Sequence, residues 1–254
     1  MKIHTESLGT GRALVLVHGW GSSHATFDRL QPALADMTRA ISVDLRGFGA
    51  TGPVRGRHGI SEMAQDLAEL ASETGPIIAL GHSMGGSVVS HLALARPDLV
   101  AGLIVIDPAY GADKEECRGL PQRRRDLAAL GSAAAVRDLS EAYSPTLPAS
   151  DKEAIRKDLE ASDGRVLLES FDGMYMTPDA LGPLPQARLW LRNRPGPVLA
   201  IYSTEKAAAI EAAISPASTI RVAPCPGHFV HLEHEDWTVQ TIREWLTATG
   251  LVAR

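Results

Sequence analysis

The stretch that decides the fold reads IIALGHSMGGSVV, residues 77–89. Its four leading apolar residues are typical of a buried strand, while Val88 and Val89 belong to a helical pattern that ends before Pro97. Gly81, Ser83 and Gly85 lie between them in the pattern G-x-S-x-G, and the glycines permit a sharp turn. We therefore expect a strand, a tight turn and a helix starting near Met84, with the Ser83 side chain pushed out of the sheet edge.

Similar apolar runs continue this alternation on both sides of the turn. They lie at residues 13–17, 40–43 and 103–106, and later at 198–203 and 219–223. Ser61 is placed to cap a helix whose apolar residues share one face: Met63, Leu67, Leu70 and Ala71. A final amphipathic helix carries Trp237, Thr241, Ile242, Trp245 and Leu246 on one side. Alternating strands and helices predict an α/β fold, a mostly parallel sheet flanked by helices.

The segment 111–190 differs from the rest of the chain. It holds charge-rich helical patterns at 122–130, 133–143, 151–159 and 165–175, and it shows no strand pattern. Long insertions of this kind commonly carry function above a sheet. We expect residues 1–110 and 191–254 to form the α/β core and residues 111–190 to form a helical cap.

Composition excludes several classes of protein. The chain has 254 residues, and its net charge of −5 does not suit a nucleic-acid binder, which needs a basic surface. The two cysteines, Cys117 and Cys225, support neither a disulfide framework nor a zinc site and fit a reducing compartment. The apolar run 13–17 is too short for a signal peptide or a membrane span. We expect a cytoplasmic protein with a small-molecule partner, and no pattern indicates an oligomeric state.

Ser83 is the first candidate catalytic residue. The helix that starts just after it directs backbone N–H groups and the positive end of its dipole at the serine oxygen, where they favour a developing negative charge. A second glycine-rich loop, His18-Gly19-Trp20-Gly21, follows the strand 13–17. The backbone amides of Trp20 and Met84 are therefore the expected oxyanion hole.

A nucleophilic serine needs a base, and nine histidines are available. His228 follows the last strand and so lies at the same sheet edge as Ser83, which favours it as the base. His82 is expected to brace the turn, and His231 and His234 are expected to be solvent-exposed or capping residues at the start of the last helix.

The histidine in turn needs a carboxylate, and the residues alone leave two candidates. Asp107 ends the strand 103–106, and Glu205 follows the strand 198–203. Both lie at the expected edge, and both keep the chain order serine, acid, histidine. Asp107 is also a natural capping residue before Pro108, and Glu205 a natural first-turn helix carboxylate.

Four segments together resemble the cap-bearing serine hydrolase branch of the α/β-hydrolase fold family: HGWG at 18–21, DLRGFG at 44–49, GHSMGG at 81–86 and PGHFVHLE at 226–233. The resemblance implies that Ser83 is the nucleophile and His228 its base, with a helical cap between the sixth and seventh strands. Relatives with the acid after the seventh strand usually show G-x-x-D there, whereas this chain reads STEK at 203–206, so the resemblance favours Asp107. The serine at position 83 does not match the family's haloalkane dehalogenase and epoxide hydrolase branches, which use an aspartate.

The expected reaction is cleavage of a small to medium apolar carboxylic ester or lactone through an acyl-enzyme on Ser83. Tyr175, Trp190 and Phe229 are the expected substrate contacts, although such side chains can equally pack a cap on its core. Nothing calls for an organic cofactor or a metal, and the nearest histidine series, His228, His231 and His234, lies next to Pro226 and Gly227 in a predicted loop.

Two alternatives remain open beside ester hydrolysis. One is a cofactor-free dioxygenase or carbon–carbon bond hydrolase on the same fold, with His228 and Asp107 as the base. The other is a receptor-like protein that keeps the pocket without turnover, which the complete serine, histidine and acid set disfavours.

Overall fold

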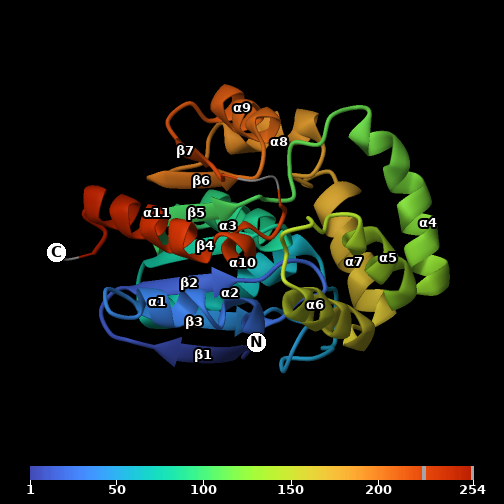
Figure 1. Cartoon of the computed structure of the whole chain (residues 1–254), viewed down its shortest axis with the longest axis horizontal. Coiled ribbons are helices and arrows are strands. Elements are labelled where there is room, and N and C mark those ends of the chain that lie inside the picture. Colours follow the sequence, from blue (N-terminus) through green and yellow to red (C-terminus); the bar gives the residue numbers. More distant parts are fainter. Residues whose placement is uncertain (225–226, 253–254) are drawn as a thin grey trace.

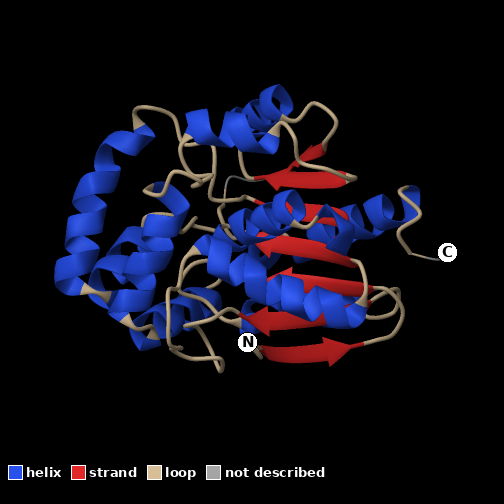
Figure 2. Cartoon of the chain, turned by 180° about the vertical axis from the view of Figure 1, so that it is seen from behind, coloured by secondary structure: helices blue, strands red, loops and turns tan. Residues whose placement is uncertain are grey.

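The computed structural model describes residues 1–224 and 227–252, so Cys225 and Pro226 lie outside the described residues. Their centre is a seven-stranded sheet with the order β1-β3-β2-β4-β5-β6-β7. The strands are β1 (His4–Leu8), β2 (Ala13–Val17), β3 (Arg39–Asp44), β4 (Ile77–His82), β5 (Val100–Ile106), β6 (Val198–Tyr202) and β7 (Thr219–Val222). All neighbours pair in parallel except β1, which runs antiparallel to β3 and points the other way in Figure 2. Six of these strands match the predicted apolar runs, while β1 is a strand that the sequence analysis did not anticipate.

Helices cover both faces of the sheet. Alternate residues of one strand enter different cores: Val15 and Val17 face the side of α2 (Ile60–Thr74) and α3 (Met84–Ala95), whereas Leu14 and Leu16 face the opposite side. That opposite side is covered by η1 (His24–Phe27), α1 (Leu30–Leu34), α10 (Val230–Glu233) and α11 (Glu235–Ala248), seen in front of the sheet in Figure 1. Burial of both faces explains why the strands read as continuous apolar runs.

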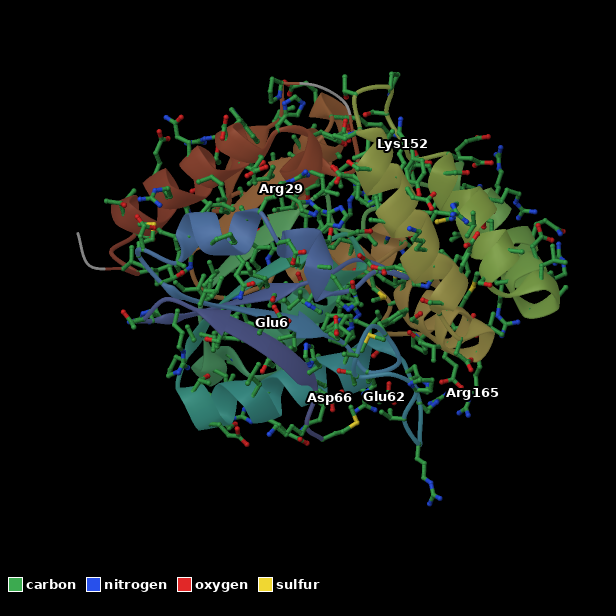
Figure 3. All side chains as sticks on the ribbon, turned by 60° about the horizontal axis from the view of Figure 1, so that its bottom comes forward. Glu6, Arg29, Glu62, Asp66, Lys152 and Arg165 are labelled. Atoms are coloured by element: carbon green, nitrogen blue, oxygen red, sulfur yellow. The ribbon has the colours of Figure 1, made fainter. Side chains whose placement is uncertain are left out.

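The helical insert lies beyond the carboxyl ends of the strands (Figure 1). It leaves after β5 and contains η3 (Glu116–Gly119), α4 (Leu120–Leu130), α5 (Ser132–Ser140), α6 (Ala149–Ala161) and α7 (Gly164–Tyr175). Hydrogen bonds join the insert to the core. Arg29 Nη2 of the core donates to Asp151 Oδ2 of the insert at 2.8 Å, and Arg165 Nη2 of the insert donates to the Gly56 carbonyl of the core at 3.0 Å. Figure 3 labels Arg29 over the core and Arg165 at the lower right of the view, well apart from each other.

The insert lies between β5 and β6, which are followed by Asp107 and Ser203 and are the sixth and seventh strands in the family's numbering. Two details differ from the expectations. α8 (Leu184–Leu191) falls inside the expected cap range, yet it packs beside α3 and α9 (Glu205–Ile214) of the core. Gly59, and not Ser61, caps α2, because Ser61 already lies inside the helix and donates to Asp179 Oδ2 at 2.8 Å. The remaining short helix is η2 (Pro97–Leu99).

Among the described helices, none combines the length and the apolar character that crossing a lipid bilayer requires.

Candidate active site

The turn between β4 and α3 holds Ser83 in a conformation that L-residues rarely adopt. Its φ is 51° and its ψ −117°, directly before the first residue of α3. The turn depends on Gly85, because a Cβ added there would lie 2.1 Å from the Val17 carbonyl oxygen. Hydrogen bonds fix the strained residue: the Ser83 amide donates to the Ile106 carbonyl at 3.0 Å, and the Ala109 amide donates to the Ser83 carbonyl at 2.9 Å. Backbone strain held this firmly is characteristic of functional sites.

The structure brings the three candidate catalytic side chains into one hydrogen-bonded line. His228 Nε2 lies 3.0 Å from Ser83 Oγ, and His228 Nδ1 lies 2.6 Å from Asp107 Oδ2. With the Nδ1 proton donated to the carboxylate, Nε2 is free to accept the serine proton. This is the geometry that an activated serine nucleophile requires.

Asp107 is built to stay ionised. Burial favours the neutral acid, but hydrogen bonds from His228 and Ser203 outweigh it and hold the pKa of Asp107 below its ordinary value. Ser203 supplies both its amide, at 3.0 Å, and its hydroxyl, at 2.9 Å, to Asp107 Oδ1. Glu205, the other candidate acid, is exposed in the first turn of α9 and has no described contact with His228. Sequence reasoning missed Ser203, whose only signal was its position after a strand next to that of Asp107.

Two buried histidines lie behind the catalytic line. His82 Nε2 donates to the His228 carbonyl at 2.9 Å, and its ring packs 4.5 Å from that of His231. Burial, with the nearby His231 and His228, lowers the pKa of His82 well below its ordinary value, so its ring is neutral. His231 corrects the expectation of a solvent-exposed residue: it is 1% exposed, because the short helix α10 turns it inward, where it lies 3.0 Å from Thr26 Oγ1.

The two expected oxyanion donors lie at the ends of elements that converge on Ser83. Met84 is the first residue of α3, so its amide has no acceptor within the helix. Trp20 follows β2, and its indole Nε1 donates to Ser170 Oγ of α7 at 3.0 Å. The insert therefore fixes the position of the loop that carries the Trp20 amide.

A cavity of about 530 Å³ opens onto Ser83 and His228, within the size range of small-molecule sites. Its apolar wall comes from Trp20 and from Phe171, Met174 and Tyr175 of α7. Charged residues that line the cavity are paired with one another: Arg123 Nε lies 3.1 Å from Asp138 Oδ2, and Lys206 Nζ lies 2.9 Å from Glu116 Oε1. The cavity is thus lined both by apolar side chains and by paired charges.

The three expected substrate contacts are placed differently. Tyr175 lines the cavity. Trp190 is not among the described lining residues: it is 41% exposed on α8, which packs on the core and not on the cavity, and this corrects the expectation. Phe229 is also not among the described lining residues, which corrects the expectation: it is 3% exposed and packs edge-on against the His228 ring.

Comparisons with known proteins agree with this arrangement. A pimeloyl-[acyl-carrier protein] methyl ester esterase of Aeromonas hydrophila is 31% identical over 207 residues, 79% of this chain and 68% of that protein. The enzyme of the same name from Shewanella woodyi is 26% identical in an alignment that covers 96% of this chain and 97% of that protein. The solved structure of a thermophilic esterase from Thermogutta terrifontis, with malate bound, matches with a TM-score of 0.82 and 26% identity, covering 97% of this chain and 93% of that one. The model of the alpha/beta hydrolase family matches residues 14–241, and this chain belongs to that family.

Proposed function

We propose that this chain is a serine hydrolase that cleaves small to medium apolar carboxylic esters or lactones through an acyl-enzyme on Ser83. The observation that carries the proposal is the line Ser83, His228, Asp107 at hydrogen-bonding distances, facing the cavity. The curated relatives are named for cleavage of a methyl ester. We propose ester cleavage for this chain, but we do not propose that it acts on their carrier-protein substrate.

The reaction follows from the positions of the side chains. Ser83 Oγ attacks the substrate carbonyl carbon while His228 Nε2 takes the serine proton. The amides of Trp20 and Met84 stabilise the oxygen that becomes negatively charged. The tetrahedral intermediate collapses, His228 returns the proton to the departing alcohol oxygen, and the acyl group stays on Ser83.

Water completes the cycle. His228 removes a proton from a water molecule, which attacks the acyl carbon, and the second tetrahedral intermediate releases the carboxylic acid and restores Ser83. Ionised Asp107 stabilises the imidazolium form of His228 in both halves of the reaction. In a lactone the departing alcohol stays attached to the acid, so the product is one hydroxy acid.

The cavity supports an apolar acyl group of limited length. Phe171, Met174 and Tyr175 offer it an apolar wall in the cavity that opens onto Ser83. We assign the cap role to the part of the insert that carries α7, because α7 supplies this wall and also accepts the Trp20 indole hydrogen bond.

A panel of p-nitrophenyl esters of increasing acyl length, together with γ- and δ-lactones, tests the proposal. We expect the highest kcat/KM for short to medium acyl chains, and a fall in kcat of about 10⁴-fold or more in Ser83→Ala. Equal activity in Ser83→Ala would overturn the nucleophile assignment. Oxygen uptake in place of acid release on a substrate panel would replace hydrolysis by the dioxygenase chemistry.

A further inference from the structure

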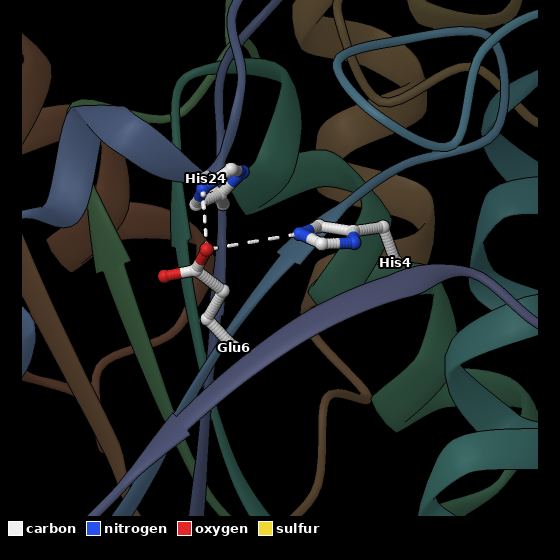
Figure 4. A group of neighbouring side chains, drawn as sticks. All are labelled: His4, Glu6 and His24. Atoms are coloured by element: carbon white, nitrogen blue, oxygen red, sulfur yellow. Dashed lines mark ion pairs between the residues drawn. The ribbon is translucent and has the colours of Figure 1, made fainter.

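Three side chains with metal-binding atoms meet at the outer edge of the sheet, away from the cavity. His4 and Glu6 lie two residues apart on β1, so their side chains leave the same face of the strand. His24, the first residue of η1, approaches from the other side. Figure 4 shows the two imidazole rings directed at the Glu6 carboxylate, and Figure 3 labels Glu6 beside the outer strand.

The separations of these atoms are close to those of a metal site. Glu6 Oε1 lies 3.3 Å from His24 Nε2 and 3.9 Å from His4 Nε2, and one ligand atom of each residue lies within 4.8 Å of the others. A tetrahedral zinc ion with bonds of about 2.0–2.1 Å sets its ligand atoms about 3.4 Å apart. The His24 and Glu6 pair already has this spacing. His4 and Glu6 have side chains 36% and 54% exposed, so they have room to adjust.

The buried carboxylate of Asp44 prepares His24 to act as a ligand. Asp44 Oδ1 lies 3.0 Å from His24 Nδ1 and accepts the His24 amide at 2.6 Å. A carboxylate at Nδ1 keeps the proton there and directs the Nε2 lone pair outward, which is the usual support for a metal-bound histidine. His24 Nε2 then faces Glu6 Oε1 at 3.3 Å, so a metal ion placed between these two atoms contacts both of them.

Asp44 is also linked to the backbone of His4, through Thr51. Thr51 Oγ1 accepts the His4 amide at 2.8 Å and donates to the Asp44 carbonyl at 2.7 Å. Asp44 thus holds the backbone and the ring of His24, and Thr51 holds the backbone of His4. Fixed donors lose less freedom when an ion binds.

We propose that His4, Glu6 and His24 bind a divalent transition metal ion, of which zinc is the reference ion. Two imidazole nitrogens and one carboxylate suit zinc, copper or nickel, whereas magnesium and calcium prefer oxygen ligands. The ion joins β1 to η1, and so to the loop that carries Trp20. Local spacing gave no sign of this site, because its ligands come from two separate segments and only the β1 to β3 pairing brings them together.

Calorimetric titration of the untagged full chain with zinc chloride tests the site. We expect one equivalent of zinc bound to the native protein, and affinity lower by at least about 10-fold in His4→Gln and in Glu6→Gln. These two variants change exposed side chains and preserve the Asp44 contact, so they should fold. Glu73→Gln, an exposed carboxylate of α2 outside the cluster, is the matched control and should bind as the native chain does.

Two further arms separate the site from the active site. His228→Ala should still bind one equivalent, since the proposed ligands are independent of the catalytic line. Zinc at 100 times its Kd should raise the unfolding temperature by about 5 °C, EDTA should reverse the rise, and magnesium should not reproduce it. Absence of saturable zinc binding, unchanged affinity in His4→Gln, or loss of binding in His228→Ala would each overturn the proposal. None of these results depends on esterase activity.

Discussion

His82 Nε2 donates a hydrogen bond to the backbone carbonyl of His228, so the residue before the proposed nucleophile, Ser83, holds the residue that we propose as its base. The bond joins the end of β4 to the loop after β7, two segments that approach only in the folded chain. Through it the turn that presents Ser83 also sets the position of the His228 backbone.

Replacing His82 should therefore affect turnover more than substrate binding. In His82→Ala we expect kcat to fall by about 10-fold with little change in KM, because about 1 to 1.5 kcal/mol of hydrogen bonding to the base loop is lost. His82→Gln keeps an N–H donor and should recover part of the loss. Steady-state kinetics on one p-nitrophenyl ester measures both constants. A kcat equal to the native value in His82→Ala would argue against a positioning role.

Replacing the two candidate acids should give opposite results. Asp107→Asn leaves the shape of the site but cannot stabilise the imidazolium, so kcat should fall by about 10³- to 10⁴-fold. Glu205→Gln changes an exposed first-turn residue and should keep kcat within about twofold. Inactivity of Glu205→Gln with activity retained in Asp107→Asn would reverse the assignment.

His231 should make the fold sensitive to mild acid. Burial, together with the charges of His228 and Arg29, lowers the pKa of His231 from 6.5 to about 3. The unfolded chain takes up this proton below pH 6.5 and the native protein does not. The contribution to stability is thus complete above pH 6.5 and is lost at about 1.4 kcal/mol per pH unit as the pH falls toward 3.

His231→Gln removes this titration and keeps a polar group near Thr26. Urea unfolding of the native chain and of His231→Gln between pH 7 and pH 4 should show a shallower loss of stability in the variant. Parallel pH profiles would contradict the assignment.

The buried ion pair Arg194–Glu211 contacts two tyrosines of the cavity lining, so its loss should affect both stability and KM. Arg194 pairs with Glu211, both side chains being fully buried, and Glu211 also accepts from the hydroxyl of Tyr202 at 2.9 Å. Arg194 Nη1 donates to the Tyr110 hydroxyl at 2.8 Å, and both tyrosines line the cavity. Glu211→Ala leaves a buried charge unpaired and should cost about 3–5 kcal/mol of unfolding free energy.

The double variant Arg194→Met, Glu211→Met provides the control, because it removes both charges and should be less destabilised than Glu211→Ala. Its KM should still rise, since Tyr110 and Tyr202 lose their partners. Urea unfolding and kinetics measure the two effects separately, and a double variant less stable than Glu211→Ala would contradict the prediction.

The sequence predicted those parts of the fold whose burial is continuous along the chain. Six strands and the turn at Ser83 follow from apolar runs and glycine spacing, because a strand buried on both faces leaves an uninterrupted apolar pattern. β1 reads HTESL and is mostly exposed, so it has no such pattern, and only pairing with β3 makes it a strand. The sequence analysis gave helix α9 no range and anticipated only its start, through Glu205 as a first-turn carboxylate.

The site was predictable as far as chain order and strand ends determine it. Ser83, His228 and Asp107 end or follow parallel strands, so they were expected at one edge of the sheet. The depth of His231, the exposure of Trp190 and the meeting of His4 with His24 depend on how helices and edge strands pack in three dimensions. No local pattern in the chain encodes those relations.

The helical insert leaves the core at Ala112 and returns to it at Pro183, and these two residues pair in an isolated parallel bridge, with the Ala112 amide donating to the Gly182 carbonyl at 2.8 Å. The two ends of the insert are therefore held at neighbouring positions, and the cost of closing a longer or shorter connection there grows only slowly with length. Ser83, His228 and Asp107 all lie outside the connection. The residues that we propose for the chemistry and the helices that shape the cavity therefore belong to different parts of the chain. Exchange of one helical insert for another can change the acyl preference while the geometry of Ser83, His228 and Asp107 stays the same.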